Sequence, residues 1–190
     1  MTPPNPDKFN GMSVFQKIGA KVIASSQTAR SIPEVHGYKK YFFVNMTMMY
    51  AEETNPVLSK PDIIFDGAYS LTLSNGEKIH LIELGKAGVS SNQTVAHVPL
   101  KNALFVGDLI HPKAHAWLEG GIIKGKPRPD IASWVTVLKE VEAEFPAETV
   151  VYGGRGDSAP LSEAVKAQTE YLIQLDAIVT KPGKARSSTR

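Results

Sequence analysis

The sequence contains no cysteine among its 190 residues. This absence excludes a disulfide-stabilised scaffold, a thiolate zinc site, an iron–sulfur cluster and a cysteine nucleophile. The fold must therefore be stabilised by burial of apolar side chains, and a domain of this size buries roughly 70% of the surface of its unfolded chain. The hydrophobic fraction of 42% and the charged fraction of 21% are typical of a globular protein.

The sequence also lacks long apolar runs and an excess of charge of either sign. No apolar stretch approaches the roughly 20 residues that are needed to cross a bilayer. The net charge of +2 gives no general attraction to nucleic acid. The start of the chain, Met1–Pro6, has neither the basic nor the apolar segment of a signal peptide. We therefore expect a cytoplasmic protein that binds neither membranes nor nucleic acid.

The length of the chain favours a single domain. We expect this domain to span residues 1–180. Residues 181–190 are basic and rich in small side chains, and they are predicted to form a flexible tail.

Two pairs of β-strands are predicted in the middle of the chain. Residues 70–84 alternate between apolar and polar side chains on either side of Asn75-Gly76. This dipeptide favours a β-hairpin with a type I′ turn, because both central residues of that turn need a positive φ. A second pair of strands is predicted at 94–98 and 103–106, joined at 99–102.

Helices with clear start signals are predicted in the C-terminal half. Asp130 precedes a segment with apolar side chains at helical spacing and is expected to cap its first turn. A strand is predicted at 149–152, and a last helix is predicted to begin near Leu161. Strands and helices that alternate in this way indicate an α/β fold with an antiparallel or mixed sheet.

The N-terminal third is less regular. A helix is predicted at 11–18, a buried strand at 21–24 and a short helix capped by Ser25–Thr28 that ends near Ala29. Residues 36–61 are poorly periodic and are interpreted as helix or as a lid loop. Within them, residues 41–50 are rich in Met and aromatic side chains, which favours packing in the core; an exposed stretch would suit a hydrophobic ligand or a partner.

Four short motifs follow one another along the chain. They are Asn5-Pro-Asp-Lys-Phe-Asn-Gly11, Gly88-Val-Ser-Ser91, Leu104-Phe-Val-Gly-Asp-Leu109 and Val150-Val-Tyr-Gly-Gly-Arg-Gly156. In their order and spacing they resemble the motifs of the metallo-β-lactamase superfamily over nearly the whole chain.

This resemblance implies an αββα sandwich from which the first N-terminal strands are missing. It also implies hydrolysis of an ester, amide, thioester or phosphoester bond. In that family histidines and a bridging aspartate hold two zinc or iron ions. The ions lower the pKa of a bound water until it is a nucleophile at neutral pH.

The resemblance places the seven metal-ligand positions of the family on Pro3, Asn5, Asp7, Lys8, Val89, Asp108 and Arg155. Two aspartates remain at these positions, and all five histidines are replaced. We therefore expect no bound metal ion. A buried carboxylate needs a partner of opposite charge, so Asp108 is predicted to pair with Lys8 or Arg155 in place of metal.

The candidate pocket residues are Asp7, Lys8, Asp108, His115 and Arg155. His111 and His115 are four residues apart and would share a helix face, but Pro112 disfavours a continuous helix through both. By the resemblance, His115 is expected to line the pocket rather than to hold a metal ion.

A glycine-rich turn is a second candidate site. The backbone amides of Gly154 and Gly156 and the Arg155 guanidinium could bind an anion. A purely structural turn explains the same residues equally well.

Two functions from different classes remain open. The first is a ligand- or partner-binding protein without catalysis, which takes a small molecule and forms a homodimer through an exposed sheet edge or the Met-rich stretch. The alternative is an active hydrolase with a reduced or shifted zinc or iron site at Asp7, Asp108 and His111 or His115. A third interpretation is a subunit that another chain completes.

Overall fold

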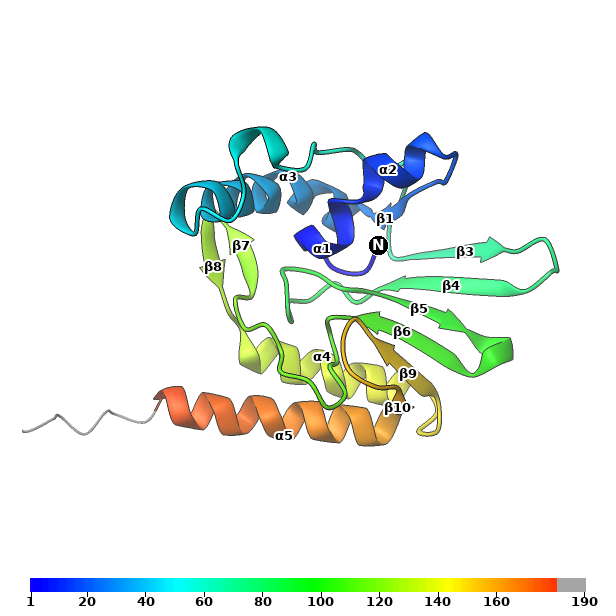
Figure 1. Cartoon of the computed structure of the whole chain (residues 1–190). Coiled ribbons are helices and arrows are strands. Elements are labelled where there is room, and N and C mark those ends of the chain that lie inside the picture. Colours follow the sequence, from blue (N-terminus) through cyan, green and yellow to red (C-terminus); the bar gives the residue numbers. More distant parts are fainter. Residues whose placement is uncertain (181–190) are drawn as a thin grey trace, which may run out of the picture.

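The computed structural model describes residues 1–180, and the predicted flexible tail lies outside them. Its centre is a six-stranded mixed sheet with the strand order β10-β9-β6-β5-β4-β3 (Figure 1). The strands are β3 (Ala68–Thr72), β4 (Lys78–Glu83), β5 (Thr94–Val98), β6 (Ala103–Gly107), β9 (Val150–Gly153) and β10 (Ala159–Pro160). The α/β fold class with a mixed sheet is confirmed.

The predicted hairpin is present as β3 and β4, but its predicted turn is wrong. Leu73 and Glu77 close the loop through a backbone hydrogen bond of 2.8 Å, and the Gly76 amide donates to the Leu73 carbonyl at 2.9 Å. Gly76 has a φ of +82°, whereas Asn75 is not among the residues with positive φ. One left-handed glycine after a turn fits a three-residue loop with a bulge, not a type I′ turn.

The second pair of strands is confirmed as β5 and β6, joined by the short 3₁₀ turn Pro99–Lys101 and by Asn102, whose φ is +45°. Strand β6 then pairs in parallel with β9, which brings Gly107 opposite Gly153. The residues that follow these two strands therefore leave the same edge of the sheet side by side, an arrangement that often forms binding sites in α/β folds.

Two long helices cover one face of the sheet (Figure 1). They are α4 (Ile131–Glu144) and α5 (Leu161–Thr180), and both begin where the sequence predicts. The Asp130 carboxylate accepts a hydrogen bond from the Ser133 amide at 2.8 Å, which confirms the predicted cap. Trp134 and Leu138 of α4 pack with Leu104 of β6 in the main hydrophobic cluster.

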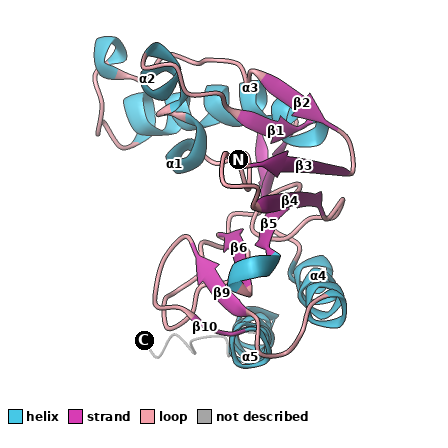
Figure 2. Ribbon diagram, turned by 90° about the vertical axis from the view of Figure 1, so that its right-hand side faces the viewer, coloured by secondary structure: helices cyan, strands magenta, loops and turns pink. Residues whose placement is uncertain are grey.

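The N-terminal elements pack around a second hydrophobic cluster. They are α1 (Pro6–Phe9), α2 (Met12–Lys17), β1 (Ile23–Ser25), α3 (Ser26–Tyr41) and β2 (Ile63–Phe65), and β1 pairs with β2 in parallel. Figure 2 shows them together at the end of the molecule opposite to α5. The cluster contains Phe9, Met12, Ile32, Val35 and Ile122.

Helix α3 is longer than predicted. Ser25 caps it as expected, because its hydroxyl accepts a hydrogen bond from the Thr28 amide. The helix does not end near Ala29 but continues past Pro33 to Tyr41. Burial of the apolar side chains on its inner face compensates for the hydrogen bond that a proline inside a helix removes. A π-helical turn at Phe42–Met46 and a 3₁₀ turn at Glu52–Thr54 follow.

The Met-rich stretch is not part of the core. Met48 is 83% exposed, and Met46, Met49 and Tyr41 are also exposed. A short hairpin of β7 (Gly121–Ile123) and β8 (Lys126–Arg128) lies beside α3. Within residues 1–180, no helix combines the length and the apolar character that a membrane crossing requires.

Two leucines close to each other in the sequence allow a matched test of this core. Leu104 is fully buried, whereas Leu100 is 75% exposed. Leu104→Ala is expected to lower the free energy of unfolding by about 2–5 kcal/mol, because it removes buried methyl groups and leaves a cavity. Leu100→Ala is expected to change it by less than about 0.5 kcal/mol. Urea denaturation followed by circular dichroism measures both, and equal losses would contradict this packing.

Candidate functional site

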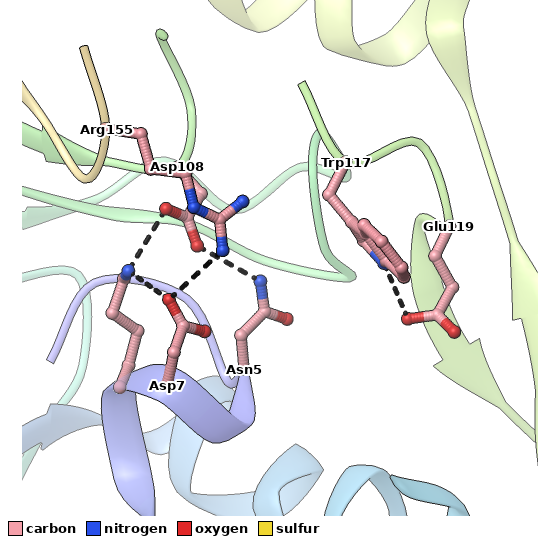
Figure 3. Close-up of polar contacts among 7 residues, drawn as sticks. Asn5, Asp7, Asp108, Trp117, Glu119 and Arg155 are labelled. Atoms are coloured by element: carbon pink, nitrogen blue, oxygen red, sulfur yellow. Dashed lines mark hydrogen bonds and ion pairs between the residues drawn. The ribbon is translucent and has the colours of Figure 1, made fainter. Parts of the chain in front are cut away.

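Three segments far apart in the sequence meet at the edge of the sheet. Asp108 follows β6, the glycine-rich turn follows β9, and the N-terminal residues before and within α1 lie against both. Figure 3 shows the side chains of Asn5, Asp7, Asp108 and Arg155 pointing toward one another. These positions and Lys8 account for five of the seven positions that the resemblance singled out.

The Lys8 ammonium connects two carboxylates. Its Nζ lies 3.0 Å from Asp108 Oδ1 and 2.5 Å from Asp7 Oδ2. Asn5 Nδ2 donates to the other oxygen of Asp108 at 3.4 Å. The Asp108 side chain is only 3% exposed, so the charge of Lys8 compensates for its loss of water. The predicted pairing of Asp108 is thereby confirmed for Lys8.

Arg155 has a different partner. Its guanidinium lies 3.8 Å from Asp7 Oδ2, and within residues 1–180 it forms no ion pair with Asp108. Burial lowers the pKa of the Lys8 ammonium, but the hydrogen bonds and charges of Asp7 and Asp108 outweigh this effect. The net result is that the pKa of Lys8 is raised above its ordinary value, and Lys8 is positively charged at neutral pH.

Glycines bring the turn after β9 close to the carboxylate. A Cβ atom at Gly154 would lie 2.3 Å from Asp108 Oδ1 and 3.0 Å from Lys8 Nζ. A Cβ at Gly156 would lie 1.8 Å from the Pro112 carbonyl oxygen. Only glycine allows so close an approach, so packing alone explains why these two residues are glycines, without any ligand.

One of the predicted anion-binding donors of this turn is used within the fold. The Gly154 amide already donates to the Gly107 carbonyl at 2.7 Å, and Gly156 has a φ of +83°. The Arg155 side chain is half exposed and makes no hydrogen bond within residues 1–180. The Gly154 amide is thus already used, whereas the Arg155 guanidinium has donors that no residue among 1–180 takes up.

Trp117 and Glu119 face this cluster from the other side of the cavity (Figure 3). The Lys39 ammonium contacts the Glu119 carboxylate, and both side chains are largely buried. Trp117 Nε1 donates to Glu119 Oε2 at 3.1 Å, and Lys39 Nζ lies 5.3 Å from the centre of the Trp117 ring. Burial and the charge of Glu119 raise the pKa of the Tyr38 hydroxyl.

The two groups enclose a cavity of about 190 Å³. Its lining consists of charged, aromatic and other side chains from both sides: Asn5, Pro6, Asp7, Lys39, Phe43, Asp108, Trp117, Glu119 and Arg155. Sequence reasoning did not find the pair of Lys39 and Glu119. The two residues are 80 positions apart, and no local pattern connects them.

The structure does not bring His115 to this cavity. His115 is exposed and lines a separate cavity of about 250 Å³ between residues 111–115 and α5. The centre of its ring lies 5.8 Å from the centre of the Tyr171 ring. His111 lines the same second cavity, and its backbone amide donates to Gln168 Oε1 at 3.0 Å.

His111 is buried, and neither ring nitrogen has a hydrogen-bond partner within residues 1–180. Burial is the main cause that lowers the pKa of His111, although the nearby carboxylate of Asp108 acts in the opposite direction.

Two of the seven metal-ligand positions implied by the resemblance lie outside the Asp108 cluster. They hold Val89, which is buried in the main hydrophobic cluster, and Pro3, which packs near Gly107. The described residues contain no group of three or more His, Cys, Asp or Glu side chains arranged to hold a metal ion.

Comparisons with known proteins find a match at the level of structure alone. No family model matches the sequence, and no curated protein matches it. The structure is similar to a metallo-β-lactamase from Pontibacter korlensis, with a TM-score of 0.64 and 19% identity over 90% of this chain. It is also similar to the metallo-β-lactamase FIM-1 from Pseudomonas aeruginosa, solved in the mono-zinc form, with a TM-score of 0.61 and 19% identity over 92% of this chain.

A metallo-β-lactamase from Hirschia baltica gives a TM-score of 0.61 and 18% identity over 90% of this chain. The chain spans 66% of the length of the Pontibacter protein and 65% of the other two. These likenesses show that the chain has the fold of the metallo-β-lactamases, as the sequence motifs predict.

The pairing of Lys8 with Asp108 predicts a loss of stability when the cation is removed. Lys8→Met is expected to lower the free energy of unfolding by about 2–3 kcal/mol at neutral pH, because it leaves a buried carboxylate without its partner. Lys101→Met, at an exposed position, is the matched control and is expected to have almost no effect.

The pH dependence has a definite sign. The pKa of Lys8 is raised in the folded protein, so its stabilisation is complete below the ordinary lysine value of 10.5 and is lost as the pH rises through the folded value. The free energies of unfolding of the parent protein and of Lys8→Met should therefore become more similar above pH 10.5. Denaturation curves at neutral and alkaline pH measure it, and a difference that widens at alkaline pH would contradict the pairing.

Proposed function

We propose that this chain uses the metallo-β-lactamase fold to bind a small molecule and that the dinuclear metal site of that fold is lost. One observation carries the proposal: the Lys8 ammonium contacts both Asp7 and Asp108, the two ligand-type carboxylates of the cluster. A cation between two carboxylates neutralises them in the way that a metal ion would.

The donor set around Asp108 does not suit two zinc or iron ions. Such ions are held by neutral imidazoles together with carboxylates, and the cluster contains carboxylates with an amide from Asn5. The positive charges of Lys8 and Arg155 would repel a divalent cation at short range. No reaction step that depends on a metal ion is therefore assigned to these residues.

The cavity next to the cluster suits a small molecule. It combines apolar surface from Phe43 and Trp117 with fixed charges on two sides, and such a mixture is typical of ligand-binding pockets. The ion pair of Lys39 and Glu119 fixes the wall that carries Trp117. These side chains can bind and orient a ligand without the chemistry of hydrolysis.

The alternative function is a hydrolase with a shifted metal site. It requires His111 or His115 to join Asp7 and Asp108 as ligands, but both histidines line the second cavity. The alternative would gain support if the purified protein held one tightly bound zinc or iron ion per chain that was lost in His111→Ala.

Metal analysis tests the proposal directly. After purification from medium supplemented with zinc, mass spectrometry of the metal content should find well below one zinc ion per chain. The double variant Lys8→His/Arg155→His should bind zinc more tightly than the parent protein, because it exchanges two cations for imidazoles beside two carboxylates. The double variant Lys101→His/Arg128→His adds the same residues at exposed positions and is the control.

Two zinc ions per chain in the parent protein would overturn the proposal. Equal zinc affinities in the two double variants would contradict the more specific claim that the charges of Lys8 and Arg155 keep a metal ion out of the cluster.

We also propose that the chain forms a homodimer through the Met-rich stretch, defined as residues 41–50. Met46, Met48 and Met49 are exposed there together with Tyr41 and Tyr50. Adjacent exposed methionines and aromatic rings favour contact with another apolar surface. Light scattering coupled to size exclusion should give twice the mass of the chain, and Met48→Asp should reduce it to the mass of one chain. A parent protein that stays monomeric at all concentrations would contradict this.

A further inference from the structure

Arg155 is the cation of the cavity with the greatest remaining capacity to bind. Lys8 contacts two carboxylates, and Lys39 contacts Glu119. The Arg155 side chain is 49% exposed, and its guanidinium lies 3.8 Å from Asp7 Oδ2, farther than Lys8 lies from its two carboxylates. A guanidinium carries five N–H donors in a planar fork that matches a carboxylate. Arg155 lines the cavity, and none of its side-chain N–H groups donates a hydrogen bond within residues 1–180.

Trp117 supplies the opposite wall. Its indole lies opposite Arg155 and Asp108 in Figure 3, and all three side chains line the cavity. The hydrogen bond from Nε1 to Glu119 and the nearby ammonium of Lys39 fix the orientation of the ring. The residue is nevertheless 52% exposed, so an oriented aromatic surface remains available to a ligand. Phe43 adds a second ring to the lining.

The charges around the cavity restrict the ligand further. Three carboxylates, those of Asp7, Asp108 and Glu119, lie in the lining. The cations of Lys8, Lys39 and Arg155 balance them, so the cavity has no excess positive charge. A phosphate with two negative charges would meet about twice the repulsion from these carboxylates that a single negative charge directed at Arg155 meets, so a singly charged ligand is favoured.

We propose that the ligand is a small aromatic carboxylate whose ring packs against Trp117 and whose carboxylate accepts hydrogen bonds from the Arg155 guanidinium. This inference rests on the proposed function, because it assigns the ligand class of the same cavity. Bidentate pairing with a carboxylate and stacking on an indole are both strong in such a setting. The volume of about 190 Å³ suits a single ring rather than a drug-sized molecule.

Three probes separate the two parts of the recognition. Benzoate carries the ring and the charge, benzamide carries the ring without the charge, and cyclohexanecarboxylate carries the charge without the aromatic ring. Isothermal titration of protein whose metal content has been measured should give the tightest binding for benzoate. Benzamide is expected to bind at least about tenfold more weakly, since it lacks the charge-assisted pair, and cyclohexanecarboxylate about fivefold more weakly.

Matched variants assign the two contacts. Arg155→Gln should weaken benzoate binding at least about tenfold and leave benzamide binding unchanged. Trp117→Leu should weaken benzoate binding about fivefold and leave cyclohexanecarboxylate binding nearly unchanged. Arg30→Gln removes an exposed arginine from α3 outside the cavity lining and should bind benzoate like the parent protein. Circular dichroism verifies that each variant is folded.

Tryptophan fluorescence gives an independent readout of the site. The chain has two tryptophans, and Trp134 is buried in the core with its indole donating to the Leu109 carbonyl at 2.9 Å. Benzoate should therefore change the emission of Trp117 alone, and the change should disappear in Trp117→Leu.

The possible failures can be told apart. Benzoate that binds no more tightly than benzamide, or equally well to Arg155→Gln, overturns the assigned ligand class. If the metal content is low at the same time, the proposed metal-free binding function stands. Two zinc ions per chain would overturn the proposed function itself, whatever the three probes show.

Discussion

The site depends on the need to compensate one buried negative charge. Asp108 directly follows β6, and its carboxylate is almost completely shielded from water. An unpaired charge in such a place is strongly destabilising. Lys8 supplies the opposite charge from α1, and Asn5 supplies a hydrogen bond. The absence of a side chain at Gly154 leaves room for this arrangement. The N-terminal segment is thus held against the sheet by electrostatics as well as by packing.

The same arrangement supports the proposal that this chain uses the metallo-β-lactamase fold without the dinuclear metal site. Once Lys8 neutralises Asp108, the edge of the sheet no longer needs a metal ion to be stable. Arg155 then remains as a cation with free donors, and Trp117 faces it from the opposite wall. We propose that this edge of the sheet holds ligand-binding groups in the present chain.

Much of the fold could be predicted because its signals are local. The strands on either side of Gly76 and the helix cap at Asp130 follow from short sequence patterns. The predicted type I′ turn was wrong, because Gly76 has a positive φ and Asn75 does not. The length of α3 could not be predicted, since burial against distant residues offsets the effect of Pro33. The cluster at Asp108 followed from resemblance, but the ion pair of Lys39 with its distant partner depends on tertiary packing alone.

We propose that the Lys8 ammonium takes the place between Asp7 and Asp108 where a metal ion would otherwise bind. A crystal structure of the protein grown in the presence of excess zinc tests it most directly. We expect electron density for the Lys8 side chain with its Nζ between the two carboxylates, and no zinc bound to Asp108. Two zinc ions bridged by Asp108, with Lys8 displaced from the cluster, would contradict it.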